Sequence, residues 1–174
     1  MAELHDIVDE NDTVIGQTTF DDAYANNKII RVAHLWVMNS TGKFLFQFRG
    51  AHKKSSPRRF DASVGGRLDV GETYEQAVVR EAVEELGLKL SVPPIYAGKT
   101  LIQKEHTKFF GVYYAYSDGP FKNWEAEAEL LEWMSYPEYR SLYERFPYLF
   151  AGTETLELVQ QALASSGHAT PITK

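Results

Sequence analysis

The sequence predicts an α/β protein in which a mixed β-sheet is sandwiched between α-helices and preceded by a small N-terminal β-hairpin. Short apolar and aromatic segments typical of strands alternate with two amphipathic segments typical of helices. The chain has 174 residues, which suits one domain with a sizeable core. We expect a hairpin extension over residues 1–27, the main domain over residues 28–165 and a flexible tail over residues 166–174.

The strands are read from runs of apolar and aromatic residues that end at polar turns. Two short strands around the polar turn 10–12 form the expected N-terminal hairpin, followed by a short helix or loop over 21–27. Residues 29–39 are almost continuously apolar, as in a buried strand, and the turn 39–42 leads into an aromatic strand over 43–49. Further strands are predicted over 97–103 and 108–116, and the segment 125–135 begins acidic and ends in an apolar strand.

The best specified helix begins after Thr73. Thr73 and Gln76 have the spacing of a capping box, and Gly87 is placed to end the helix. At about 100° per residue, one arc gathers apolar side chains. These are Val78, Val79, Ala82, Val83 and Leu86.

Two more helices are predicted nearer the C-terminus. Pro137 opens a short helix. Thr153 is expected to cap a final amphipathic helix that carries Leu156, Val159 and Leu163 on one face.

Composition excludes several classes of function. The formal net charge of −6 argues against a nucleic acid polymer or an anionic membrane as partner. The chain has no cysteine, so disulfides, thiolate catalysis and cysteine-based zinc sites are excluded. The N-terminal residues lack the basic and apolar regions of a signal peptide, and no run reaches transmembrane length. We therefore expect a cytoplasmic protein.

Three carboxylates on the helix after Thr73 carry the functional prediction. Glu81, Glu84 and Glu85 stand three and four residues apart and therefore share one helical face. Like charges at this spacing destabilise a helix unless something compensates them. Three carboxylates form a hard-oxygen site that suits Mg²⁺, with Mn²⁺ as the alternative.

The stretch from Gly66 to Leu88 resembles the signature of the Nudix (MutT-like) hydrolases, G-x5-E-x7-R-E-U-x-E-E-x-G-U, where U is aliphatic. Every fixed position is filled, by Gly66, Glu72, Arg80, Glu81, Glu84, Glu85 and Gly87. The resemblance implies the Nudix fold over about residues 28–165. It also implies a Mg²⁺-dependent hydrolase that cleaves a diphosphate linkage in a nucleoside-diphosphate-linked or related organic pyrophosphate by water attack at phosphorus.

The same resemblance suggests roles for individual residues. The carbonyl of Gly65 is implied as a metal ligand beside the three glutamates. Arg80 and Glu72 are expected to orient those glutamates by ion pairing. Family members often supply a further carboxylate ahead of a strand with tryptophan, and Glu127 is the first choice for it, with Glu129 second. The general base stays open among Glu81, Glu127 and Glu129.

A basic loop precedes the signature on this otherwise acidic protein. Residues 50–59 carry Lys53, Lys54, Arg58 and Arg59. The loop is either simply solvated or faces the phosphates of a substrate, for which arginine is well suited. Arg49 and Arg67 are further candidates, and Glu129 is grouped with these substrate-binding residues. His34 is expected to be a satisfied core residue, and His106 an ordinary loop histidine.

Two alternatives accompany the hydrolase prediction. The layout, with FDASVGG before the signature, resembles the branch that contains isopentenyl-diphosphate isomerase. That enzyme uses a cysteine and a metal-binding histidine where this chain has Gly65 and Arg67, so isomerase chemistry is disfavoured. A non-catalytic nucleotide-binding module is the second alternative, although such modules commonly lose signature glutamates. A homodimer is common in the family.

Overall fold

The N-terminal hairpin is built onto the edge of the main sheet. In this computed structural model, which describes residues 3–166, β1 (Leu4–Val8) and β2 (Val14–Thr19) pair antiparallel and lead into α1 (Phe20–Ala25). β1 also pairs with the first residues of β3 (Ile29–Met38). The predicted hairpin is therefore confirmed, whereas the domain boundaries remain predictions and most of the proposed tail lies outside the described residues.

The sheet is mixed and has β3 at its centre. β3 pairs antiparallel with β1, β4 and β6 and parallel with β8. The other strands extend the sheet on either side. Their bounds are β4 (Phe44–Arg49), β5 (Phe60–Asp61), β6 (Val64–Arg67), β7 (Ile95–Gln103), β8 (Thr107–Tyr116) and β9 (Ala128–Met134).

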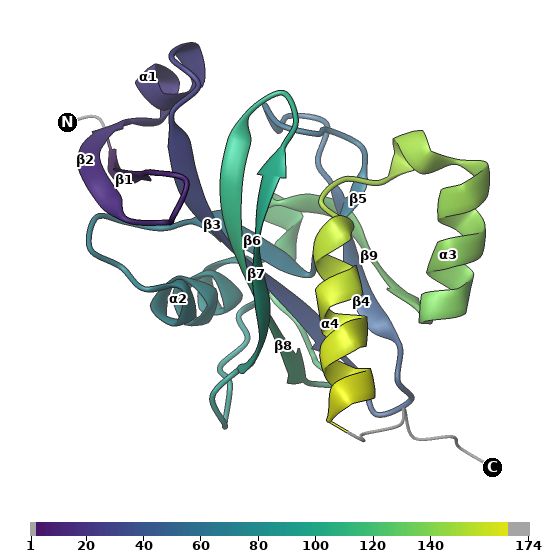
Figure 1. The fold of residues 1–174 in the computed structure, drawn as a ribbon. Helices are drawn as coiled ribbons and strands as arrows, with labels where there is room; N and C mark the ends of the chain where they lie inside the picture. The colour runs from purple at the N-terminus through teal and green to yellow at the C-terminus, as the bar shows by residue number, and fades with distance from the viewer. Residues whose placement is uncertain (1–2, 167–174) are drawn as a thin grey trace.

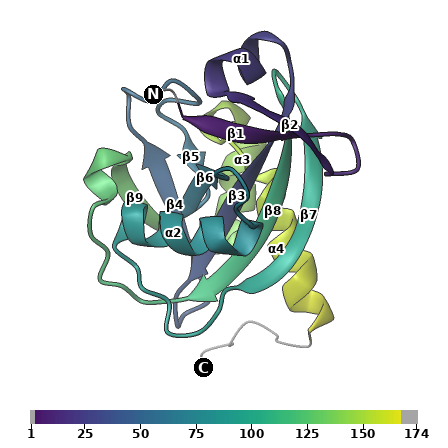
Figure 2. The same cartoon turned by 90° about the vertical axis from the view of Figure 1, so that its left-hand side faces the viewer.

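Helices cover both faces of this sheet, which confirms the predicted α/β sandwich (Figures 1 and 2). Side chains alternate along β3, because successive residues of a strand point to opposite faces. Leu35 and Val37 pack in the core beneath α2 (Tyr74–Leu86). Trp36 and Met38 pack in the opposite core, beneath α3 (Tyr136–Arg145) and α4 (Glu154–Ser165). Short 3₁₀ turns occupy Trp124–Ala126 and Pro147–Leu149.

Three details differ from the sequence predictions. On α2, Val79 and Val83 are 40% and 38% exposed, whereas Glu85 is buried, so the buried face is rotated from the predicted arc. Thr153 precedes α4 in a helical conformation and its side chain makes no capping hydrogen bond. Strands β5 and β6 were not predicted, because two and four residues are too few for a periodic signal.

Within residues 3–166, no helix is long and apolar enough to cross a membrane.

Candidate active site

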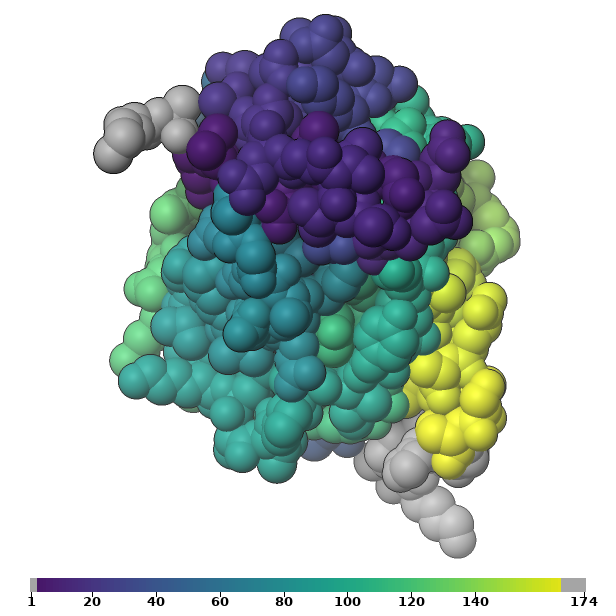
Figure 3. Space-filling model, turned by 60° about the vertical axis from the view of Figure 1, so that its left-hand side comes forward, coloured from purple at the N-terminus to yellow at the C-terminus, as the bar shows by residue number. Residues whose placement is uncertain are grey.

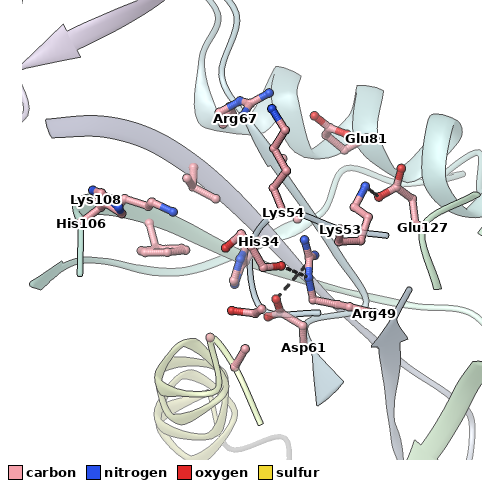
Figure 4. Close-up of a pocket in the computed structure, with 18 of the residues that line it drawn as sticks. His34, Arg49, Lys53, Lys54, Asp61, Arg67, Glu81, His106, Lys108 and Glu127 are labelled. Atoms are coloured by element: carbon pink, nitrogen blue, oxygen red, sulfur yellow. Dashed lines mark hydrogen bonds and ion pairs between the residues drawn. The ribbon is translucent and has the colours of Figure 1, made fainter. Parts of the chain in front are cut away.

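A cavity of about 780 Å³ opens beside the signature helix. Its wall combines α2, the centre of β3, the β5–β6 segment, the basic loop and the β7–β8 turn with α1 of the N-terminal extension. In Figure 4, Glu81, Lys53 and Glu127 lie at one end of this cavity and His106 and Lys108 at the other, with His34 between them. Elements that are far apart in sequence therefore build one elongated site.

Local capping fixes the start and the end of α2, and with them the rotation of its acidic residues. Thr73 Oγ1 accepts from the backbone N–H of Gln76 at 3.2 Å, and the Gln76 side chain accepts from the N–H of Thr73 at 2.9 Å. Gly87 ends the helix in the left-handed region at φ 59°. The capping box and the glycine stop are both as predicted.

Arg80 is the hub of the acidic cluster. Its Nε and Nη2 donate to the two oxygens of Glu72 at 2.9 and 2.8 Å, and its Nη1 donates to Glu81 Oε1 at 2.8 Å. Nη2 also donates to the carbonyl of Arg67 at 3.0 Å. The guanidinium lowers the pKa of Glu72, and the surrounding carboxylates raise that of Arg80. These contacts are what the predicted orienting role of Arg80 and Glu72 requires.

Glu85 is a buried carboxyl group with few partners. Its Oε2 lies 3.3 Å from the N–H of Gly65 and 3.5 Å from Nε2 of Gln47. Burial, together with the charges of Glu81 and Glu127, raises the pKa of Glu85 to about 8. Burial also raises the pKa of Glu81, although Arg80 acts in the opposite direction. The folded protein alone therefore disfavours the ionised form of Glu85, and a bound cation would favour it.

Gly66 makes room for this cluster. A Cβ atom at residue 66 would lie 1.8 Å from Oε1 of Glu81, which is impossible without moving that side chain. The first glycine of the signature therefore allows the Glu81 carboxylate to pack directly against the backbone.

The remaining predicted carboxylates are placed differently from one another. Glu127 lines the cavity and forms an ion pair with Lys53. The side chain of Glu84 is 58% exposed, outside the cavity lining, and lies 3.4 Å from Arg80. Glu129 also lies outside the lining, where it accepts from the N–H of Ala51 at 3.0 Å and faces Arg58 at 3.6 Å.

The donor set suits a divalent cation by its chemistry, since Glu81, Glu85 and Glu127 are oxygen donors whose charges act on one another within the cavity. Among residues 3–166, however, no three acidic or histidine side chains are close enough to form a ready coordination sphere. Arg80 holds Glu81 and Lys53 holds Glu127 instead. Cation binding would therefore require these two ion pairs to open.

The basic residues divide into paired and unpaired groups. Arg49 lies 3.7 Å from Asp61 and donates to the carbonyl of Ser55 at 3.1 Å. Arg67 lies 4.0 Å over the ring of Phe20 and 3.7 Å from Glu3. Lys54 and Arg59 line the cavity without an ion pair in the described part of the chain. Arg58, in contrast, is outside the lining and 69% exposed.

Sequence reasoning missed several residues of the cavity wall. His34 is buried, as expected of a core residue, but it also lines the cavity, and burial lowers its pKa. Phe20 and Tyr24 reach the cavity from α1, and the ring of Tyr24 stacks on His106 at 3.5 Å between ring centres. Their signal is weak: two aromatics four residues apart in a polar segment, and one polar residue in an apolar strand.

Comparison with known proteins places this arrangement in a family. Residues 28–151 match the NUDIX domain family. The chain is 35% identical over 145 residues to a Nudix hydrolase of Nostoc sp., covering 76% of this chain and 86% of that protein. It is 33% identical to a Nudix hydrolase of Yersinia pestis, covering 77% and 74% of the two chains.

Solved structures agree with this assignment. The crystal structure of DR0079 from Deinococcus radiodurans has a TM-score of 0.71 and 29% identity, covering 91% of this chain and 98% of that one. The NUDIX domain of Shewanella oneidensis NrtR, solved with ADP ribose, shares the fold with a TM-score of 0.61 and 15% identity over 86% and 99% of the chains. The signature, the fold and these relatives together identify the chain as a Nudix hydrolase.

Proposed function

We propose that the protein hydrolyses a diphosphate linkage in a nucleoside-diphosphate-linked or related organic pyrophosphate, with Mg²⁺ as its cofactor. The observation that carries the proposal is that Glu81, Glu85 and Glu127 line one cavity, together with Lys54 and Arg59, which have no ion pair in the described part of the chain. Divalent cations are the general cofactor of the family. The carboxylates suit such a cation, and the lysine and arginine suit the phosphate oxygens of a substrate.

The residues of the chain have distinct parts in this proposal. Glu81, Glu85, Glu127 and the Gly65 carbonyl would hold the cation, and Arg80 with Glu72 would set the position of Glu81. When bound, the cation supplies charge neutralisation at the phosphoryl oxygens and lowers the pKa of a coordinated water. Arg49, Lys54 and Arg59 would bind the phosphate oxygens. Glu84 would join the cation only after its side chain turns inward.

We propose that the general base is Glu81 or Glu127. Glu129 lies outside the cavity lining, bound to Ala51 and facing Arg58, so it is the least suited of the three candidates. Glu81 and Glu127 both line the cavity. Either carboxylate would take the proton of the attacking water, and each is paired with a cation, Glu81 with Arg80 and Glu127 with Lys53.

The isomerase alternative receives no support from this site. The position at which isopentenyl-diphosphate isomerase carries its cysteine corresponds to Gly65. A Cβ atom there would lie 2.9 Å from Cδ2 of His34, so the backbone is packed against an imidazole where a reactive side chain would be needed. Membership in that branch, a homodimer and a cytoplasmic location remain proposals.

The decisive experiment combines a substrate screen with one substitution. Nucleotide sugars, dinucleoside polyphosphates, nucleoside triphosphates and isoprenoid diphosphates are incubated with Mg²⁺, and the products are followed by phosphorus NMR. Glu85→Gln should lower kcat by about 100-fold or more while the protein keeps its circular dichroism spectrum, because a buried carboxylate of the proposed cation site is lost.

The matched control is Glu75→Gln, which alters an exposed glutamate on the same helix. It should retain the activity of the unaltered protein. Hydrolysis that persists at full rate in folded Glu85→Gln would exclude the proposed cation site, and the absence of metal-dependent turnover across the whole panel would favour a non-catalytic binding module.

A further inference from the structure

His34 occupies an unusual place in the middle of the central strand. It is 5% exposed and stands in a run of apolar neighbours, yet its side chain lines the cavity. Figure 4 shows it between the end of the site with Glu81 and Glu127 and the end with His106 and Lys108. Burying an imidazole is unfavourable unless both of its ring nitrogens have partners. The hydrogen bonds of this ring therefore indicate what it is for.

The hydrogen-bond network fixes which nitrogen of His34 carries the proton. The hydroxyl of Thr155 has one hydrogen, which it donates to the carbonyl of Gly152 at 2.8 Å. Its oxygen is therefore left to accept, and it receives the indole N–H of Trp36 at 3.0 Å. His34 Nδ1 lies 3.0 Å from the same oxygen and must likewise be a donor. Nδ1 carries the proton of the neutral ring, and Nε2 presents a bare lone pair.

Two glycines and a phenylalanine hold the ring in this orientation. A Cβ at residue 65 would lie 3.0 Å from Nε2, and one at residue 152 would lie 3.0 Å from Cε1. Phe110 meets the ring edge-on at 4.7 Å between ring centres. The ring makes its one hydrogen bond within residues 3–166 through Nδ1, and Nε2 is not among the fully enclosed polar atoms of the described chain. The result is a fixed acceptor on the cavity wall whose partner is not supplied by the described chain.

A second acceptor lies beside this ring. The same Cβ position at Gly152 that approaches His34 would be 2.5 Å from Oδ1 of Asp61, so the carboxylate and the imidazole flank one glycine. Hydroxyl groups, such as those of a sugar, are donors from which both of these side chains can accept. Oδ1 of Asp61 already accepts from the N–H of Ala62 at 2.8 Å, and its other oxygen faces Arg49 at 3.7 Å. A hydrocarbon chain offers no hydrogen-bond donor and would therefore leave Nε2 of His34 as the acceptor without a partner.

We propose that Nε2 of His34 accepts a hydrogen bond from a hydroxyl group of the moiety attached to the diphosphate, and thereby selects sugar or polyol diphosphates. This inference rests on the proposed diphosphate hydrolysis and specifies its substrate class. His34 is a specificity-determining residue in this assignment. A site built to receive a hydroxyl discriminates strongly against analogues that lack one, because the buried acceptor is then left unpaired.

The first test observes the ring itself and needs no turnover. Histidine labelled with nitrogen-15 is introduced into the protein, and the His34 nitrogens are assigned by their loss in His34→Phe. In the free protein Nδ1 should be protonated and Nε2 bare. With Ca²⁺ in place of Mg²⁺, phosphoribosyl diphosphate, which has hydroxyls and no base, should shift Nε2 towards the hydrogen-bonded value.

Two further ligands separate the possible donors in the same experiment. Dideoxyadenosine diphosphate offers an amino group without a sugar hydroxyl, and isopentenyl diphosphate offers neither. Both should leave Nε2 unshifted. A proton on Nε2 in the free protein, an equal shift with all three ligands, a shift with the dideoxy compound alone, or no shift with any of them would overturn the proposal.

The second test compares substrates in the Mg²⁺-dependent assay. His34→Phe should reduce the ratio of kcat/KM for phosphoribosyl diphosphate over isopentenyl diphosphate by about tenfold, the value of one hydrogen bond. His5→Gln is the matched control, because His5 is also a buried histidine but lies outside the cavity lining. It should leave the ratio unchanged, whatever it does to stability.

The two tests fail separately. An Nε2 shift with the sugar ligand but no hydrolysis of any diphosphate would leave the acceptor in place and refute the proposed function. Metal-dependent hydrolysis with an unchanged substrate ratio in His34→Phe would support the proposed function and refute the role of His34.

Discussion

Gly66 shows at the scale of one residue why the signature begins with glycine. A Cβ at this residue would lie 1.8 Å from Oε1 of Glu81. Alanine would therefore displace the carboxylate from its position against the backbone. We expect Gly66→Ala to destabilise the fold by about 1–3 kcal/mol through overpacking and to reduce kcat, as measured by urea denaturation and phosphorus NMR.

Gly16→Ala is the control for Gly66→Ala. Its added Cβ would come no closer than 3.5 Å to Ile7, which is an ordinary contact. Both stability and activity should change little there. If Gly66→Ala changed stability and kcat as little as Gly16→Ala does, the position of Glu81 would not depend on a glycine at residue 66.

The raised pKa of Glu85 makes the stability of the metal-free protein depend on pH. Because the folded pKa, about 8, exceeds the ordinary value of 4.5, the stability contributed by the protonated carboxyl is fully present below pH 4.5 and is lost as pH rises through about 8. We expect the free energy of unfolding in a chelator to fall across this window. Glu85→Gln should lack that part of the decline.

Denaturation by urea at several pH values measures this effect. Adding Mg²⁺ should restore stability to the unaltered protein at pH 8 and have a smaller effect on Glu85→Gln, since the proposed cation binds the ionised carboxylate. Identical pH profiles for the two proteins would show that Glu85 titrates normally in the folded state.

At the scale of the element, α2 depends on its capping box to present the signature. Thr73→Ala removes the hydroxyl that accepts from Gln76 N–H, and should cost about 1 kcal/mol in urea denaturation. Thr73→Ser keeps the oxygen and should restore most of the loss. Equal destabilisation by both substitutions would assign the effect to packing of the threonine methyl group instead.

Elements with strong local signals were predictable from the sequence, and those set by long-range packing were not. The capping box, the Gly87 stop and the apolar run of β3 are encoded within a few residues. The exposure of Val79 and the burial of Glu85 depend on where the sheet meets α2, which periodicity alone cannot locate. The two shortest strands depend on their neighbours, since β6 pairs with β3 and β5 pairs with β4.

The candidate site was predictable only in part, and for the same reason. The glutamates share one contiguous helix, so spacing was enough to group Glu81 with Glu85. His34 and Tyr24 reach the cavity from β3 and α1, and their approach depends on the folded arrangement. Arg58 and Lys54 stand in the same loop, yet only Lys54 lines the cavity.

At the scale of the whole molecule, hydrogen bonds and ion pairs join the N-terminal extension to the domain. Figure 3 shows the N-terminal residues, in purple, covering one end of the molecule against the teal segment that includes α2. Asp12, in the hairpin turn, is the anchor: it accepts from Arg31 Nε of β3 at 2.7 Å and from the Tyr74 hydroxyl of α2 at 3.1 Å. It also lies 2.5 Å from Lys99 Nζ of β7. One carboxylate therefore joins the extension to three elements.

Removing this anchor should weaken the molecule and open its cavity. The Asp12 side chain is 6% exposed, and Asp12→Ala would leave Arg31, itself 17% exposed, without its carboxylate. We expect a loss of about 3–5 kcal/mol, the usual result of breaking a buried ion pair, measured by urea denaturation. Because α1 places Phe20 and Tyr24 on the cavity wall, KM should also rise more than kcat falls.

Asp21→Ala provides the matched control, since Asp21 is an exposed acid on α1 of the same extension. Its stability and KM should match those of the unaltered protein. If Asp12→Ala lowered stability but left KM unchanged, the extension would be a structural support alone, and the aromatic wall that α1 contributes would have no part in holding the substrate.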